Sequence, residues 1–176
     1  MERLAGYAAR LPVGDPREPG TVVGPVIPAA HRDRVEAYVG LGRKEGAVVV
    51  AGGERPPLER GFHVAPTVLA DCTDDMRVAR EEIFGPVVVV VPVDDEDEAV
   101  ALADDSEYGL IDYVWSADVP RAFRVARRLR TGGVGINTVG RTWRRPPAGS
   151  AAAASAGTSA PTRCTPAEVQ SIVRPG

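Results

Sequence analysis

The sequence contains few of the residues that build most reactive and metal-binding sites. Among its 176 residues there are two cysteines and two histidines. Two cysteines cannot form a framework of several disulfides, so we expect a protein of a reducing compartment, the cytoplasm. His31 and His63 each lack a second ligand at a metal-binding spacing, so no metal site is predicted.

Neither cysteine has the surroundings of a reactive thiol. Cys72 lies in the stretch LADCTDD, and acidic neighbours raise the pKa of a thiol. We therefore interpret Cys72 as a structural residue. Cys164 lies in a C-terminal segment that has no periodic pattern.

Long apolar runs and a strong net charge are also missing. The longest apolar run, Val87–Val91 with Pro92 and Val93, is far shorter than a membrane-spanning helix, and no signal peptide is expected. The net charge of −3 gives no reason to expect a nucleic-acid partner. Neither GxGxxG nor GxxxxGK occurs, so no phosphate-binding glycine loop is predicted.

Hydrophobic periodicity indicates alternating helices and strands. Residues 29–47 place Val35, Tyr38, Val39 and Gly42 on one helical face, and Gly46 is expected to end that helix. The β-branched run 87–93 is typical of a strand covered on both faces. The other expected elements are a helix ending within 1–10, a buried strand in 47–53, two extended pieces in 61–72 separated by Pro66, one helical turn or an irregular stretch in 74–86, and strands at 112–116 and 134–138.

Two further helices complete the pattern. The first follows residue 93, with Asp94 as its expected N-cap, and the second runs from Asp118 to Gly132. The apolar residues of the second helix are expected to form its inner face: Val119, Ala122, Phe123, Ala126 and Leu129. The alternation predicts an α/β fold with an open, mostly parallel sheet and flanking helices.

Adjacent carboxylates occur in REEIFGP, where Glu81 and Glu82 precede Phe84 and a Gly-Pro turn. Two carboxylates could serve acid–base chemistry, and they could equally belong to a solvated turn before a strand. The Gly-Pro pair is expected to place the side chains of Glu82 and Phe84 at the entry of the following strand.

Arginines are concentrated on the helix that follows Asp118. Five of them lie there: Arg121, Arg124, Arg127, Arg128 and Arg130. A basic helix is compatible with nucleic-acid binding, and also with the solvated face of an amphipathic helix. Because little aromatic interleaving accompanies the arginines, we favour the solvated face.

Several stretches in a fixed order resemble a known family. They are VGDPREPGTVVGPVI, RVEAYVGLGRKEGAVVVAGG, GFHVAPTVLAD, REEIFGPVV, DDEDEAVALADDSEYGL and VWSADVPRAFRVARRLRTGGVGIN. Together they resemble the C-terminal part of the catalytic domain in the NAD(P)-dependent aldehyde dehydrogenase superfamily, with EEIFGP as the most specific piece. The resemblance covers about residues 4–140. It departs locally at Asp112 and Tyr113, where the family more often has small residues.

The resemblance implies an oxidoreductase that converts an aldehyde to a carboxylic acid with NAD or NADP as cofactor. In this family a cysteine thiolate attacks the aldehyde, hydride passes to the cofactor, and a glutamate activates the water that releases the acid. The residue matching Glu82 hydrogen-bonds the nicotinamide-side ribose, and the residue matching Phe84 packs beside the nicotinamide. We therefore expect Glu82 and Phe84 to be cofactor-binding residues.

The family's nucleophile, general base and cofactor domain correspond to residues upstream of this sequence. No catalytic residue is therefore assigned within it, and we expect a fragment that is inactive alone. The alternative is a non-catalytic folding or assembly partner. Family members are typically homo-oligomers whose last strand joins an oligomerisation sheet, and AEVQSIV near the C-terminus resembles that strand.

The family's glycine-rich loop does not follow residue 138 in this sequence, but another reading frame of the same coding DNA could encode it. Shifted by one base, Ala148–Thr158 permits GGFRRSGIGRD, which resembles that loop. We hypothesise a frameshift between Arg141 and Pro147 that is compensated near Thr165–Ala167. An ordinary Ala/Ser/Gly tail is the alternative, and the coding DNA decides between them.

The expected organisation therefore has three parts. Residues 1–140 form a partial aldehyde dehydrogenase catalytic domain, 141–166 form an unpatterned, frameshifted segment, and 167–176 are a remnant of the oligomerisation strand. Residues 145–165 are expected to be poorly ordered, because alanine and serine cannot replace glycines in a tight loop.

Overall fold

The computed structural model describes residues 1–138. These residues belong to two compact units, one formed by Met1–Val93 and one that begins at Asp94, and each is described by itself. The expected segments 141–166 and 167–176 lie outside the described residues.

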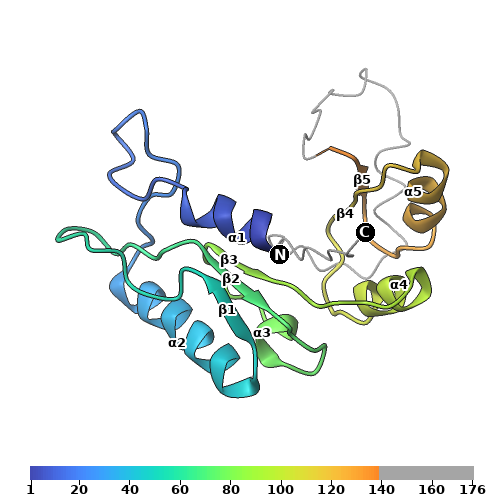
Figure 1. Cartoon of the computed structure of the whole chain (residues 1–176), viewed down its shortest axis with the longest axis horizontal. Coiled ribbons are helices and arrows are strands. Elements are labelled where there is room, and N and C mark those ends of the chain that lie inside the picture. The colour runs from blue at the N-terminus through green and yellow to red at the C-terminus, as the bar shows by residue number, and fades with distance from the viewer. Residues whose placement is uncertain (139–176) are drawn as a thin grey trace, which may run out of the picture. The chain divides into compact units, whose positions relative to one another are not determined.

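The first unit is a small mixed sheet with helices on both faces. Its strands follow the order β1-β2-β3, with β2 parallel to β3 and antiparallel to β1. Figure 1 shows α1 on one side of this sheet and α2 on the other. The elements are α1 (Glu2–Ala9), α2 (Ala29–Glu45), β1 (Val48–Ala51), β2 (Thr67–Ala70), α3 (Arg77–Arg80) and β3 (Val87–Val89).

The central strand β2 divides the core of this unit into two layers. All four of its residues are buried. Leu69 packs into the cluster that α2 supplies with Val35 and Val39, whereas Val68 packs with Ala8 of α1 on the opposite face. Successive side chains of a strand point to opposite faces, so one fully apolar strand serves both layers.

Helix α2 follows its sequence signals closely. Val35, Val39 and Gly42 are its buried residues, and Gly46 ends the helix in the left-handed conformation with φ 108°. A Cβ atom at Gly42 would lie 3.0 Å from Leu69 Cδ1, so glycine allows the helix to approach the sheet closely. The predicted helix and its end are confirmed.

The expectation of a mostly parallel sheet is only partly correct. The strand expected in 47–53 is present as β1, an antiparallel edge strand, but its predicted burial was wrong, because Val48 and Val50 are exposed. The connection from β1 to β2 contains no helix, and without a crossover the chain returns antiparallel. Of the two extended pieces expected in 61–72, only β2 is a strand.

The described part of the second unit is a β-α-β arrangement preceded by a helix. Strands β4 and β5 pair in parallel, and α5 lies between them in the chain. The elements are α4 (Glu96–Asp104), β4 (Asp112–Val114), α5 (Val119–Ala126) and β5 (Val134–Ile136). The coarse α/β prediction is confirmed, but within residues 1–138 the strands form two small sheets.

The sequence predicted the N-cap of α5 correctly and missed the N-cap of α4 by one residue. The side chain of Asp118 accepts a hydrogen bond from Arg121 N, as expected for the cap of α5. For α4 the cap is Asp95, which accepts from Glu98 N, so the prediction of Asp94 was wrong by one residue. Helix α5 ends at Ala126, well before the expected stop at Gly132.

The predicted inner face of α5 is only partly buried. Ala122 is fully buried, but Val119 and Phe123 are each about half exposed, at 49% and 51%. The apolar spacing correctly indicated a helix. The apolar spacing did not indicate that Val119 and Phe123 are half exposed in the described part of this unit.

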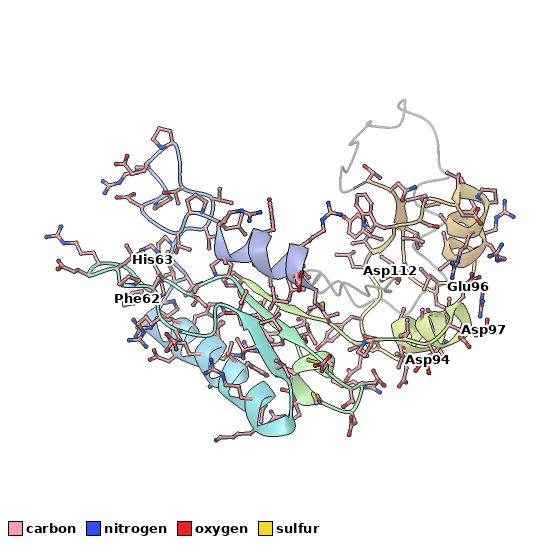
Figure 2. All side chains as sticks on the ribbon, in the orientation of Figure 1. Phe62, His63, Asp94, Glu96, Asp97 and Asp112 are labelled. Atoms are coloured by element: carbon pink, nitrogen blue, oxygen red, sulfur yellow. The ribbon has the colours of Figure 1, made fainter. Side chains whose placement is uncertain are left out.

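Two arginines of α5, and Arg128 just after its end, form ion pairs with acidic residues of α4. Glu96 pairs with Arg121 and Arg124 at 3.1 and 3.0 Å, and Arg128 lies 2.7 Å from Asp97. Figure 2 labels Glu96 and Asp97 beside this cluster. These contacts favour the solvated, ion-paired face over a nucleic-acid surface.

None of the helices in residues 1–138 combines the length and the apolar character that crossing a bilayer requires.

Candidate functional site

The segment Glu81–Gly85 connects α3 to the start of β3 and carries both predicted cofactor-binding residues. Glu82 is buried, with 8% of its surface exposed, whereas Phe84 is 42% exposed. Phe84 has φ 55°, a left-handed conformation that is uncommon for residues with a side chain. The structure places both residues just before the strand, as the Gly-Pro turn predicted.

The two adjacent carboxylates have different surroundings. The carboxylate of Glu81 accepts from Arg77 Nε and from the Tyr38 hydroxyl, each at 2.6 Å. Arg77 and then Tyr38 lower the pKa of Glu81 to about 2, so Glu81 is ionised near neutral pH and cannot act as a general acid. Within residues 1–138 no hydrogen bond or ion pair reaches the Glu82 carboxylate, and its oxygen atoms are not among the fully buried ones without a partner.

The backbone of the segment is attached to helix α2. Arg34 Nη2 donates to the Glu82 carbonyl oxygen at 2.7 Å, and His31 Nε2 lies 2.6 Å from the Phe84 carbonyl oxygen. Between them, Ile83 is 1% exposed and belongs to the main hydrophobic cluster. The sequence did not identify His31 and Arg34 as part of the site. The helical spacing that places Val35 and Tyr38 on one face of α2 nevertheless includes both of them.

This arrangement can bind a ligand that carries hydroxyl groups next to a flat ring. A carboxylate with unused acceptor capacity can accept hydrogen bonds from two hydroxyl groups. An exposed aromatic side chain offers a surface against which a planar ring can pack. Glu82 and Phe84 supply these two features from neighbouring positions in the chain.

Cys72 is not suited to nucleophilic catalysis. Its side chain is buried, and its Sγ lies 3.7 Å from the Ala70 carbonyl oxygen. Burial is the main cause that raises the thiol pKa, and Asp71 and Glu45 raise it further. The structural interpretation of Cys72 agrees with this geometry, and Cys164 lies outside the described residues.

The two histidines have different surroundings. His31 contacts the Phe84 carbonyl, whereas His63 is buried beside Phe62, as Figure 2 shows. The His63 Nδ1 atom has no hydrogen-bond partner within residues 1–138. In the same range, no three side chains of His, Cys, Asp or Glu come together in a way that could hold a metal ion.

Asp112 is a largely buried carboxylate in β4, labelled in Figure 2. Its Oδ2 atom has no hydrogen-bond partner within residues 1–138. Burial raises the pKa of Asp112, and the negative charge of Asp104 adds to this, while a hydrogen bond from Thr131 opposes it. Folding therefore disfavours the ionised form of Asp112 relative to the unfolded chain.

We expect Asp112→Asn to raise the midpoint of thermal unfolding of the second unit at pH 7. A pKa raised by folding adds stability below the unfolded pKa, and that stability is lost as pH rises through the folded pKa. The neutral amide removes this loss. Scanning calorimetry at pH 7 and at pH 4 tests the prediction, because the advantage of the variant should shrink at pH 4. An advantage that is equal at both pH values, or absent at both, would contradict it.

Residues 1–158 match the family described as "Aldehyde dehydrogenase family". The chain is 50% identical over 137 residues to a geranial dehydrogenase of Castellaniella defragrans and 47% identical over 140 residues to a betaine aldehyde dehydrogenase of Rhizobium etli. Each match covers 78% of this chain, but only 28% and 29% of the relative.

Solved structures agree with the sequence relatives. An aldehyde dehydrogenase of Mycobacterium tuberculosis complexed with NAD+ matches with TM-score 0.77 and 44% identity, over 80% of this chain and 29% of that one. An aldehyde dehydrogenase of Bacillus cereus in complex with NAD+ matches with TM-score 0.75 and 43% identity, over 80% of this chain and 28% of that one. The chain thus spans less than a third of the length of these relatives.

Proposed function

The chain belongs to the aldehyde dehydrogenase family, and from this premise we propose that it is a catalytic-domain segment of an enzyme that oxidises an aldehyde to a carboxylic acid with NAD or NADP. In this proposal Glu82 accepts hydrogen bonds from the hydroxyl groups of the nicotinamide-side ribose. Phe84 packs beside the nicotinamide ring and limits its movement, which aids hydride transfer.

The contrast between Glu81 and Glu82 carries this proposal. Arg77 and Tyr38 occupy the carboxylate of Glu81, whereas no hydrogen bond or ion pair within residues 1–138 reaches the carboxylate of Glu82. The oxygen atoms of Glu82 are not among the fully buried side-chain atoms without a partner, so they stay open to a ligand next to the exposed Phe84, which favours a role in binding. The NAD+ present in similar solved structures supports the choice of cofactor class.

We expect Glu82→Gln to weaken binding of nicotinamide mononucleotide about tenfold or more. A hydrogen bond to a charged group contributes about 1.5 to 3 kcal/mol, and the amide removes both the charge and one acceptor. Binding is measured by nuclear magnetic resonance titration of the full chain, following the amide signals of residues 82–84. Adenosine monophosphate, the other half of the cofactor, should not move these signals.

The control for this titration is Glu59→Gln, which removes an exposed carboxylate and should bind nicotinamide mononucleotide like the wild type. Equal affinity of the Glu82→Gln variant and the wild type would remove Glu82 from the proposed site. Signals of residues 82–84 that stay unchanged at saturating ligand would refute the proposal as a whole.

The purified chain is expected to produce no NADH or NADPH from an aldehyde and NAD+ or NADP+ above the rate in buffer. Cys72 is buried and its thiol pKa is raised, and the sequence around Cys164 does not resemble that of the family's nucleophile. Geranial and betaine aldehyde are suitable test substrates, because similar enzymes are named for them. Turnover above the buffer rate would overturn the expectation.

A second candidate is a non-catalytic folding or assembly partner that associates with another copy of this chain. The half-exposed Val119 and Phe123 on α5 favour it, because apolar side chains on one helix face are commonly covered by a partner. The strand expected in residues 167–176 lies outside the described residues. Size-exclusion chromatography with and without residues 166–176 tests this candidate: a monomer in both cases would contradict it.

A further inference from the structure

One face of helix α2 contacts nearly every residue of the segment Glu81–Gly85. His31, Arg34, Val35 and Tyr38 follow the spacing i, i+3, i+4 and i+7, which places four side chains on one side of a helix. Tyr38 donates to the Glu81 carboxylate, and Arg34 donates to the Glu82 carbonyl oxygen. His31 contacts the Phe84 carbonyl oxygen. The segment therefore runs along α2 in the opposite direction.

The fit between α2 and the segment is close at Gly85. A Cβ atom at Gly85 would lie 2.7 Å from Val35 Cγ1 and 2.8 Å from Val35 Cγ2, closer than carbon atoms can approach. Val35 is fully buried and cannot move aside easily. The glycine thus allows the backbone after Phe84 to touch the helix.

The polar contacts hold two carbonyl groups of the segment. Arg34 donates to the carbonyl of Glu82 at 2.7 Å, and His31 Nε2 lies 2.6 Å from the carbonyl of Phe84. Because a carbonyl oxygen can only accept, His31 must carry a hydrogen on Nε2 in this arrangement. Both proposed cofactor-binding residues are therefore attached to the same helix through their own backbone.

The left-handed conformation of Phe84 gives these contacts a specific role. A residue with a side chain rarely stays at φ 55° unless its surroundings hold it there. The hydrogen bond from His31 acts on the carbonyl of Phe84 itself. The backbone direction at Phe84 also determines where its exposed ring points.

We propose that His31 and Arg34 are positioning residues, which orient Phe84 and Glu82 for the nicotinamide half of the cofactor through backbone carbonyls. The inference rests on the proposed function of Glu82 and Phe84. His31 and Arg34 need not touch the cofactor in this role. They fix the conformation of the segment before the cofactor binds, which lowers the ordering cost of binding.

The test compares two pairs of variants of the full chain. His31→Gln keeps an N–H donor that can reach the Phe84 carbonyl, whereas His31→Leu removes it. Arg34→Lys and Arg34→Met form the matching pair for the Glu82 carbonyl. Arg34 is exposed, so we expect its two variants to fold. The comparison of Arg34→Lys with Arg34→Met therefore keeps the test decisive if a His31 variant does not fold.

The first measurement needs no ligand: the amide-to-Hα coupling and the Cα chemical shift of Phe84 report its φ angle. We expect the left-handed values in the wild type, His31→Gln and Arg34→Lys, and their loss in His31→Leu and Arg34→Met. The second measurement is the affinity for nicotinamide mononucleotide, which should fall about fivefold to tenfold in the Leu and Met variants and recover in the conservative ones.

Retention of the left-handed Phe84 in both His31→Leu and Arg34→Met would overturn the positioning role. If the wild type itself does not bind nicotinamide mononucleotide, the proposed function fails, and the φ angle of Phe84 still decides whether α2 holds the segment. Loss of affinity without a change at Phe84 would assign His31 and Arg34 to direct ligand contact and overturn the inference.

Discussion

Replacing Ile83 with alanine is expected to lower the free energy of unfolding by about 2 to 5 kcal/mol and to abolish binding of nicotinamide mononucleotide. Ile83 is 1% exposed and packs in the main cluster between α2 and the sheet. Truncation removes buried apolar surface and leaves a cavity that a well-packed core cannot fill completely. Ile83 also anchors the residues on either side of it, Glu82 and Phe84.

Urea denaturation followed by circular dichroism measures the loss of stability, and titration with nicotinamide mononucleotide measures the loss of binding. The matched control is Leu58→Ala, which removes the same number of carbon atoms from an exposed side chain. It should cost less than about 0.5 kcal/mol and leave binding unchanged. A similar cost at both positions would show that Ile83 is not part of the core.

Replacing Gly52 with alanine is expected to cost about 3 kcal/mol or more, because two effects add. Gly52 has φ 66°, and a residue with a side chain pays about 1 to 2 kcal/mol in that region. An added Cβ would also overlap the Pro66 carbonyl oxygen and would lie 2.7 Å from Thr67 Oγ1. Relief of such an overlap typically costs a further 1 to 3 kcal/mol.

The control for Gly52 is Gly40→Ala in the interior of helix α2. A Cβ atom at Gly40 would meet no atom within 4 Å, so the substitution should stabilise the protein by up to about 1 kcal/mol. Denaturation curves of the two variants should therefore shift in opposite directions. A stabilising Gly52→Ala would contradict the close approach of Gly52 to the Pro66 carbonyl.

The features that the sequence predicted correctly depend on local interactions. Helix α2 has apolar residues at helical spacing and ends at Gly46, and Asp118 caps α5 with its own side chain. Asp94 and Asp95 are chemically identical, so composition could not decide which one would meet the N–H of Glu98. Only the backbone geometry at the start of α4 makes that choice.

The features that were missed depend on partners distant in the sequence. A run of valines such as residues 48–50 suits an edge strand as well as a central strand. Only the pairing with β2 shows that β1 is an edge strand. Similarly, the spacing of Val119 and Phe123 indicates a helix face without indicating what covers it.

The candidate site combines both kinds of information. Glu82 and Phe84 were found through the resemblance of EEIFGP to the family motif, and the structure adds their burial, exposure and backbone conformation. Helical spacing places His31 and Arg34 on one face of α2, but nothing in the sequence indicates their partners, which are backbone carbonyls about 50 residues away. Contacts to a carbonyl do not depend on the identity of the partner residue, so no motif records them.

The most direct test of the proposed function is whether the nicotinamide ring lies next to Phe84. Nuclear Overhauser effects between the ring protons of Phe84 and those of nicotinamide mononucleotide can be measured on the full chain at saturating ligand. We expect cross-peaks between the two rings in the wild type and their loss in Glu82→Gln at the same ligand concentration. Cross-peaks from the nicotinamide only to residues outside Glu81–Gly85, or none at saturation, would contradict the account.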